Sequence, residues 1–459
     1  MKRELAGASQ VRAVTGRWAG TGTSLALAGG GDAAHGAFPH VVAWNLTRRC
    51  NLACSHCYIA AGSWHGSAGE METRACLGIV DQILSVNPSP LLILSGGEPL
   101  AREDLEEIAA HAARGGATVV VGTNGTGLTP ARIESLKEAG VQGFAVSVDS
   151  LNPRYHDRFR HGGGALAETL AAVDRLRAEE MDVVIQTTLT RGNREEIPDL
   201  VAWAARQGAV CFNLYFLVQT GRGERMEGLS ASENDGVVRQ LARLQAEYRG
   251  RLMVRSKCQP QLMRHVYETD AESPLLNYRT RCPCGVQYCR ITPEGQVTPC
   301  PYLPAVAGDL REASFEEVWW ESSLFRLLRR GTLGGRCGRC EYRELCGGCR
   351  ARAYAADGDF LGEDPSCAYQ PTGDLPPVPT PHAVSYGDAA TRCLAWTPEA
   401  EDRLAAVPSF VRGVVARRVE EYARREGRDR VTVEMLTQVR RELPVDFSKR
   451  LPFFARGRG

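Results

Sequence analysis

The stretch VVAWNLTRRCNLACSHC, residues 41–57, joins an apolar, β-branched run to a tight group of three cysteines. The run has the composition of a buried strand. Cys50, Cys54 and Cys57 follow it with the spacing C-x3-C-x2-C. Three thiolates on one short loop can hold three irons of a cubane 4Fe–4S cluster and leave the fourth iron open. Because His56 lies inside the loop, a zinc site is one alternative, and buried structural thiols are another.

Alternating strands and helices continue from this loop to residue 218. With the run at 41–47, β-branched runs at 91–97, 117–125, 143–150, 182–190 and 210–218 make six strands. Helical stretches with apolar residues three and four apart lie between them at 103–114, 130–140 and 165–180. Such alternation predicts βαβ units and a parallel sheet. Six strands are too few for a closed eight-stranded barrel, so we expect an α/β fold built on a partial (β/α)6 TIM-like barrel.

Polar residues gather where these strands end. Gly96, Gly97 and Glu98 follow the second strand, and Ser147 and Asp149 lie at the end of the fourth. Because the carboxyl ends of parallel strands meet at one edge of a barrel, functional residues are expected there. The glycines would let a ligand approach the backbone closely, and Glu98 could accept a hydrogen bond from an ammonium group. A plain β-turn and a polar strand end are the structural alternatives.

The composition is unusual in its 16 cysteines among 459 residues. The chain is too long for a small disulfide scaffold and its first residues lack the apolar core of a signal peptide, so we expect a cytoplasmic, metal-binding protein. No apolar run is long enough for a transmembrane helix. Fifty-five basic and 54 acidic residues leave a net charge of +1, which gives no electrostatic case for binding nucleic acid or anionic lipid.

A second region, residues 282–370, holds most of the other cysteines. These are Cys282, Cys284, Cys289, Cys300, Cys337, Cys340, Cys346, Cys349 and Cys367. The region has little apolar periodicity, so we expect metal rather than a large apolar core to organise it. Paired C-x2-C knuckles are also typical of a zinc ribbon, which is the alternative. Cys258 stands alone before this region and is interpreted as a buried thiol, with a substrate-facing role as the alternative.

The domain organisation follows from these regions and from the composition of the segments between them. An Ala- and Gly-rich start predicts disorder, five prolines predict a linker, and two apolar stripes predict a helical module near the end. The predicted divisions are a disordered lead at 1–38, the barrel at 39–218, a mostly helical bridge at 219–281, the Cys-rich region at 282–370, the linker at 371–391 and a small all-helical domain at 392–446.

Several motifs resemble those of the radical S-adenosylmethionine (SAM) superfamily, over about residues 40–218. CNLACSHC (50–57) resembles its cluster loop, SGGEP (95–99) the segment that holds the amino group of SAM, and VSVDS (146–150) the stretch at its ribose and methionine end. His56 departs from the family, which usually has an aromatic residue there. The resemblance implies a 5′-deoxyadenosyl radical that takes a hydrogen atom from substrate, and a low-potential electron donor such as flavodoxin or ferredoxin. The residues so implied to bind SAM are Gly96, Gly97, Glu98, Ser147 and Asp149.

The Cys-rich region resembles the SPASM extension of radical SAM enzymes, which holds two auxiliary 4Fe–4S clusters. By this resemblance a distal cluster would be held by Cys337, Cys340, Cys346 and Cys367. A proximal cluster would be held by Cys300 and Cys349 together with two of Cys282, Cys284 and Cys289. The family usually places three residues between its last close pair of cysteines, whereas two lie between Cys346 and Cys349 here.

Two blocks, YFLVQTGRGE (215–224) and YCRITPEGQVTPCPYLP (288–304), resemble the tetrapyrrole-modifying members of alternative heme pathways, which include anaerobic heme b synthase and d-type heme biosynthesis. Residues 394–424 resemble the C-terminal domain of light-independent protochlorophyllide reductase. The implied substrate is a tetrapyrrole whose propionate side chains are changed, for example by oxidative decarboxylation. The alternatives are a SPASM maturase of ribosomal peptides or protein side chains, and an iron–sulfur electron carrier or sensor. The sequence singles out no catalytic residue.

Overall fold

The computed structural model describes residues 37–271, 273, 276, 281–373, 375–378, 393–407 and 409–442. The predicted lead at 1–38 and linker at 371–391 lie mostly outside these residues, as does the end of the predicted helical domain beyond residue 442. Among the described residues, no helix has both the length and the apolar character that crossing a bilayer would need.

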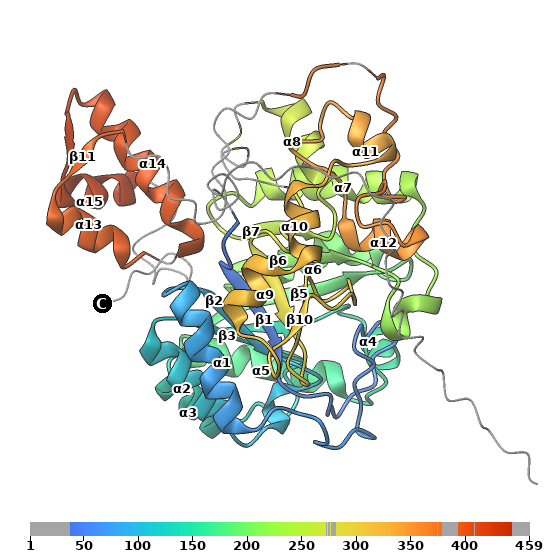
Figure 1. Cartoon of the computed structure of the whole chain (residues 1–459). Coiled ribbons are helices and arrows are strands. Elements are labelled where there is room, and N and C mark those ends of the chain that lie inside the picture. Colours follow the sequence, from blue (N-terminus) through green and yellow to red (C-terminus); the bar gives the residue numbers. More distant parts are fainter. Residues whose placement is uncertain are drawn as a thin grey trace, which may run out of the picture. The chain divides into compact units, whose positions relative to one another are not determined.

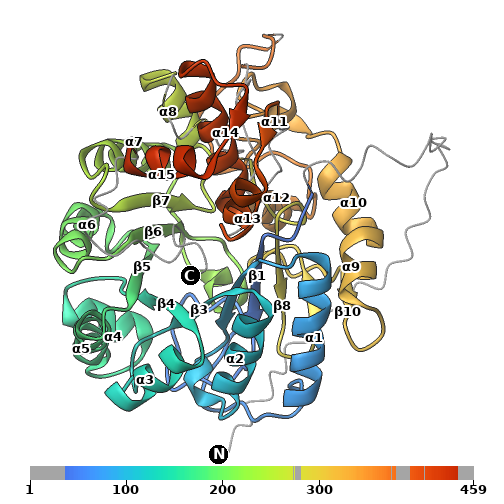
Figure 2. The ribbon, with the colours of Figure 1, turned by 90° about the vertical axis from the view of Figure 1, so that its left-hand side faces the viewer.

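A ten-stranded sheet with the order β10-β9-β8-β1-β2-β3-β4-β5-β6-β7 organises the chain (Figure 1). Its parallel centre consists of β1 (Val41–Asn45), β2 (Leu91–Ser95), β3 (Thr118–Thr123), β4 (Val141–Ser147), β5 (Asp182–Leu189) and β6 (Cys211–Phe216). The helices around it are α1 (Thr73–Val86), α2 (Leu105–Gly115), α3 (Pro130–Glu138), α4 (Pro153–Arg160), α5 (Ala165–Ala178) and α6 (Ile197–Arg206). Figure 2 shows these helices outside the curved sheet. The prediction of a partial (β/α)6 barrel is confirmed.

The central strands are rich in β-branched residues because both of their faces are covered. Alternate residues of β3 pack outward against helices, while Val120 faces the barrel interior. Val120 packs there with Ala145, Val184 and Cys211 from the next three strands, whose register aligns Ala145 with Val184 and Val184 with Cys211. This apolar layer fills the interior near the start of the strands and leaves polar side chains toward their carboxyl ends.

The structure extends the sheet beyond both edges of the predicted barrel. β7 (Met253–Lys257) pairs in parallel with β6, and β8 (Tyr288–Ile291) pairs in parallel with β1. β7 lies in the segment expected to be mostly helical, between α7 (Ala231–Glu247) and α8 (Leu262–Thr269). The Cys-rich region therefore contributes a strand to the same sheet as the first cysteine loop.

Beyond β8, the Cys-rich region contains short elements. They are β9 (Gln296–Thr298), β10 (Gly308–Asp309), α9 (Phe315–Glu321), α10 (Ser323–Arg330), α11 (Gly335–Arg339) and α12 (Arg350–Asp357). Phe315, Trp319 and Phe325 are fully buried, and the Arg329 guanidinium lies 4.6 Å from the Trp319 ring centre. These aromatic residues belong to the same apolar core as the barrel strands and helices, so apolar packing as well as metal organises this part of the region, which the sequence did not predict.

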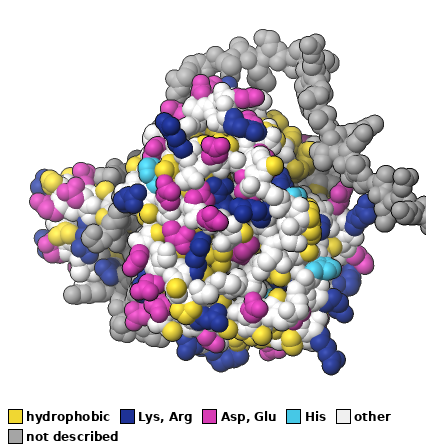
Figure 3. Space-filling view, turned by 90° about the horizontal axis from the view of Figure 1, so that it is seen from below, with side chains coloured by type: hydrophobic (Ala, Val, Ile, Leu, Met, Phe, Trp, Pro, Cys, Tyr) yellow, Lys and Arg dark blue, Asp and Glu magenta, His cyan; other side chains and the backbone are white. Residues whose placement is uncertain are grey.

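The C-terminal module contains α13 (Pro398–Ala405), α14 (Ser409–Arg425) and α15 (Val433–Glu442). Val419, Val431 and Leu436 are buried in its core, as the two predicted apolar stripes require. It is helical apart from one pair of two-residue parallel strands, β11 (Ala395–Trp396) and β12 (Arg430–Val431). On the face of the molecule seen in Figure 3, acidic and basic side chains are interspersed, in keeping with the near-neutral net charge.

Candidate functional site

The first three cysteines lie on the loop that follows β1, at the carboxyl ends of the barrel strands. Backbone amides point at two of the sulfurs: the N–H of Leu52 donates to Cys50 Sγ at 3.4 Å and that of Ala61 to Cys57 Sγ at 3.3 Å. Such hydrogen bonds favour thiolate over thiol. Among the described residues no three His, Cys, Asp or Glu side chains are close enough to hold a single metal ion. The fit to a cluster therefore rests on these amides and on the charges around the sulfurs.

Those charges favour a bound cationic group. Burial raises the pKa of Cys50 to about 12 and also raises the pKa of Cys54, so the thiolates need positive charge beside them. Arg160 supplies some of it, with its Nη1 4.0 Å from Cys54 Sγ. Iron in a cluster would supply the rest. His56 packs face to face on Phe159 at 4.6 Å, and burial lowers its pKa to about 4, so it lies in the loop as a neutral ring.

The glycines after β2 lie against the cysteine loop. The N–H of Gly97 donates to the Thr47 carbonyl at 2.6 Å, and the N–H of Glu98 donates to the Arg49 carbonyl at 2.8 Å. A Cβ on Gly96 would lie 2.7 Å from Thr47 O, and a Cβ on Gly97 would overlap Arg49 O. Glycine is therefore required here for backbone-to-backbone contact with the cysteine loop, in addition to any contact with a ligand.

Replacing Gly97 with alanine is expected to displace the cysteine loop, because the added Cβ overlaps the carbonyl immediately before Cys50. We expect the G97A protein to lose the iron of the first cluster and to bind SAM at least about tenfold more weakly. Iron analysis and equilibrium binding of SAM under anaerobic conditions measure both. Gly236→Ala is the matched control, since its Cβ would enter open space on α7. Wild-type iron content and SAM affinity in G97A would contradict the expectation.

Glu98 is buried, and three donors from the chain occupy its carboxylate. Oε1 accepts from the Leu100 N–H at 3.2 Å and from Thr123 Oγ1 at 2.8 Å, while Oε2 accepts from the Asn124 N–H at 2.9 Å. Burial raises the pKa of Glu98 to about 7 against these hydrogen bonds. These hydrogen bonds connect the end of β2 to the end of β3. A contact between Glu98 and the SAM ammonium group stays a prediction.

The carboxylate of Asp149 is also occupied by hydrogen bonds from other residues of the protein. Its Oδ2 pairs with Arg160, at 2.8 Å from Nε and 2.7 Å from Nη2, and its Oδ1 accepts from the Thr188 N–H at 2.7 Å. Burial alone would raise the pKa of Asp149, but the Arg160 guanidinium outweighs it and holds the pKa below its usual range. Asp149 therefore positions Arg160 beside Cys54. Ser147 ends β4 in register with Gln186 of β5, and its predicted contact with SAM is untested.

Four cysteines of the second region come together at one place. Cys282 Sγ and Cys284 Sγ are 3.4 Å apart, and Cys300 and Cys349 interact electrostatically with both. The Cys258 thiol joins them through a hydrogen bond with the sulfur of Cys349. We call these five cysteines the proximal group. The group includes Cys258, which was interpreted from the sequence as a lone buried thiol.

Cys289 is not brought into the proximal group. It is fully buried on β8, facing the helices with Ile291, while Tyr288 and Arg290 alternate to the barrel interior. The charged group that acts on its thiol is the Arg329 guanidinium. Of the three cysteines offered for the proximal cluster, the structure thus places Cys282 and Cys284 with the others.

The four cysteines predicted for the distal cluster line one pocket. They are Cys337, Cys340, Cys346 and Cys367, and Gln261 and Asp364 line the same pocket. Backbone amides again point at sulfur, from Gly348 to Cys346 Sγ and from Asp364 to Cys337 Sγ, each at 3.4 Å. The pocket therefore has both the thiols and the amide donors that a second cluster needs.

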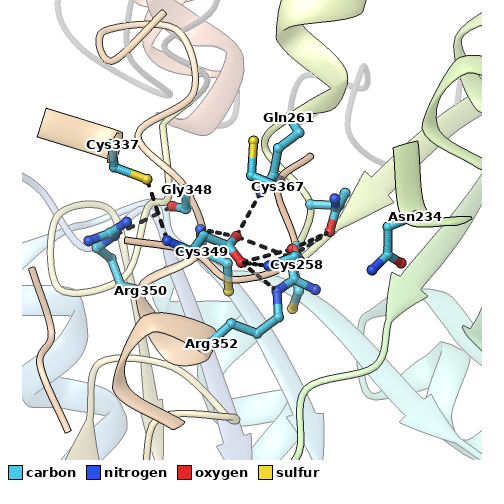
Figure 4. A network of polar contacts seen from close by, with 12 residues as sticks. Asn234, Cys258, Gln261, Cys337, Gly348, Cys349, Arg350, Arg352 and Cys367 are labelled. Atoms are coloured by element: carbon cyan, nitrogen blue, oxygen red, sulfur yellow. Dashed lines mark hydrogen bonds and ion pairs between the residues drawn. The ribbon is translucent and has the colours of Figure 1, made fainter. Parts of the chain in front are cut away.

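A buried carboxylate, Asp364, connects the two cysteine groups. Its Oδ2 accepts from the Cys349 N–H and from Gln261 Nε2, both at 2.8 Å, and Oδ1 pairs with Arg352 Nε at 3.2 Å. Figure 4 shows Gln261, Cys349 and Arg352 near one another, with Cys337 and Cys258 on opposite sides of Cys349. Arg352 in turn donates to the Cys258 carbonyl. These contacts, which join residues far apart in the sequence, could not be read from spacing.

Comparison with known families follows this division of the chain. Residues 44–204 match the radical SAM superfamily, residues 282–350 match the iron–sulfur cluster-binding SPASM domain, and residues 396–440 match the proto-chlorophyllide reductase 57 kD subunit. The chain belongs to the radical SAM superfamily. It is thus an enzyme whose cofactors are SAM and 4Fe–4S clusters.

Its relatives include proteins named AdoMet-dependent heme synthase. The one from Methanosarcina barkeri is 40% identical over 343 residues, which cover 72% of this chain and 97% of the relative. The one from Nitratidesulfovibrio vulgaris is 34% identical, with 72% and 92% covered. Among solved structures, Streptococcus suis SuiB bound to S-adenosylmethionine shares the fold, with a TM-score of 0.59 and 14% identity over 72% of this chain and 78% of SuiB.

Proposed function

We propose that this enzyme changes the propionate side chains of an iron porphyrin by oxidative decarboxylation to vinyl groups. The observation that carries the proposal is the similarity, over nearly the whole relative, to a protein named AdoMet-dependent heme synthase. The barrel interior offers independent support. We also propose that the enzyme works in the cytoplasm with a flavodoxin- or ferredoxin-like electron donor, in keeping with its 16 cysteines, none of which forms a disulfide.

Aromatic rings lie between the first cysteine loop and the proximal group. Tyr58 directly follows Cys57, Tyr302 lies close after Cys300, and the ring centres of Tyr58 and Tyr302 are 5.3 Å apart. Tyr215 extends the set at 6.4 Å from Tyr302. Aromatic rings can pack against the face or the edge of a flat aromatic macrocycle. A substrate held beside them would lie between the place where hydrogen is taken and a place that can receive an electron.

The chemistry needs these two places. SAM bound to a reduced cluster on Cys50, Cys54 and Cys57 would supply a 5′-deoxyadenosyl radical, which would take one hydrogen atom from the propionate carbon next to the ring. Loss of carbon dioxide and of one electron then leaves a vinyl group, so each turnover requires an electron acceptor. The proximal cysteines beside Tyr302 are the acceptor site that this chain offers. The protein's own part is to orient the propionate and to exclude water from the interior.

Anaerobic incubation with SAM, a chemical reductant and iron-coproporphyrin III tests the proposal. We expect each 5′-deoxyadenosine to accompany the loss of one carbon dioxide and two hydrogens from the porphyrin, read by mass spectrometry. The same incubation without SAM is the control, because no hydrogen can then be taken. Formation of 5′-deoxyadenosine with no change in porphyrin mass would show that the substrate belongs to another class, such as a ribosomal peptide.

A further inference from the structure

Two of the basic side chains on the inward face of the barrel come from β8 and β7, the outermost of its parallel strands. Arg290 lies on β8, in register with Ala43 of β1, and Lys257 ends β7, in register with Tyr215 of β6. The alternate residues Ile291 and Val254 pack into the outer core, so Arg290 and Lys257 point the other way. The Arg290 guanidinium lies 5.8 Å from the ring centre of Tyr58. Both cations are therefore on the side of the sheet that holds the tyrosines.

These cations lack the acidic partners that buried charge usually has. Arg290 is only 6% exposed; its Nη1 donates to the Pro301 carbonyl at 3.2 Å, while its buried Nε has no partner. Within the described residues, neither Arg290 nor Lys257 forms an ion pair with a carboxylate. Lys257 is partly exposed at the end of β7. Because an uncompensated buried charge is costly, Arg290 is expected where an anion binds, and Lys257 adds a second cation on the same side of the sheet.

We propose that Arg290 and Lys257 form a carboxylate-binding site in the barrel interior, which holds propionate side chains of the substrate. The inference rests on the proposed function and adds the groups that recognise the substrate. A guanidinium can bind a carboxylate through two parallel hydrogen bonds, and an ammonium group adds a point charge. A cation on the reacting carboxylate would oppose its departure as neutral carbon dioxide. The site therefore holds propionates that the product keeps, and so fixes which ones react.

A second explanation of Arg290 has to be separated from this one. Pro301, which accepts its hydrogen bond, directly follows Cys300, so the guanidinium could instead offset the negative charge of a proximal cluster. In that case its loss would change the cluster and leave substrate affinity unchanged. The test therefore compares ligands that differ only in their carboxylates.

The experiment is an anaerobic absorbance titration of the iron-loaded protein, without SAM, with iron-coproporphyrin III and with its tetramethyl ester. R290Q and K257Q are each expected to weaken binding of the tetra-acid about 10- to 100-fold, as the loss of a charge-assisted hydrogen bond implies. Binding of the ester should change less than about threefold. R290K should recover part of the affinity. The matched control is R329Q, since Arg329 is a half-buried arginine on the outer side of the sheet that donates to the Gly285 carbonyl.

Each other outcome has its own meaning. Equal weakening of acid and ester binding in R290Q and K257Q would overturn the inference, because the residues would then serve the fold or the ring. Unchanged affinity with altered iron content or cluster spectrum in R290Q would also overturn it and assign Arg290 to the cluster. If the wild type converts the porphyrin and both variants bind it normally, only this inference fails. If the wild type neither binds nor converts it, the proposed function fails with it.

Discussion

Replacing Cys54 with alanine is expected to abolish 5′-deoxyadenosine formation and to lower iron from about twelve to about eight atoms per chain. Cys54 lies between Cys50 and Cys57 on the loop after β1, and Arg160 approaches its sulfur. Two remaining thiolates do not hold a cubane firmly, so the first cluster should be lost while the two auxiliary clusters stay. Iron and sulfide analysis of anaerobically purified protein, with chromatography of the nucleoside, measures both effects.

Cys393→Ala is the matched control, because this exposed cysteine lies outside all three groups. It should keep wild-type iron content and activity. Retained SAM cleavage in C54A would contradict the assignment of the first cluster. About four irons per wild-type chain, together with zinc, would restore the zinc-ribbon interpretation of the second region.

Asp364→Asn is expected to lower the free energy of unfolding by about 3–5 kcal/mol, the typical cost of breaking a buried ion pair by removing one partner. The substitution keeps the size of the side chain but leaves the Arg352 guanidinium buried without its counter-charge. It also weakens the acceptor that receives the Cys349 N–H and the Gln261 amide. Urea unfolding of the anaerobic holoenzyme measures the change.

Asp357→Asn is the control for this variant. Asp357 is exposed at the end of α12, and asparagine can still accept the Asp359 N–H, so the change should stay within about 0.5 kcal/mol. D364N should also lose auxiliary iron while the first cluster is retained, because Asp364 contacts cysteines of both auxiliary groups. Unfolding of D364N at the wild-type urea concentration would show that solvent or rearrangement replaces the ion pair.

The barrel could be predicted from the sequence because its strands are buried on both faces and read as continuous β-branched runs. β7 was missed for the converse reason. Its five residues, MVRSK, are two apolar residues followed by three polar ones, and its inward face carries Arg255 and Lys257. A short strand with two basic residues has no strong hydrophobic signal. Its existence depends on the edge of β6, which is a tertiary feature.

The cysteine loop could likewise be found from spacing, while its supporting residues could not. Arg160 ends an ordinary helix, and Asp364 lies in an irregular segment, so neither has a local signal. Their roles arise from pairings with Asp149 and Arg352 that only the fold creates. Cys289 is instructive in another way. Recognising β8 as a strand would have separated it from the other cysteines, because alternation places it outward.

Because β8 pairs with β1, the Cys-rich region forms part of the wall of the barrel interior. Residues of the two regions alternate in one hydrogen-bonded ladder, and the Phe38 N–H donates to the Val286 carbonyl just before it. The barrel and the Cys-rich region therefore share one sheet and are not independent domains joined by a linker. A change in the Cys-rich region that shifts this ladder would also move the β1 and β8 side chains of the barrel interior, so the two regions are not expected to vary independently.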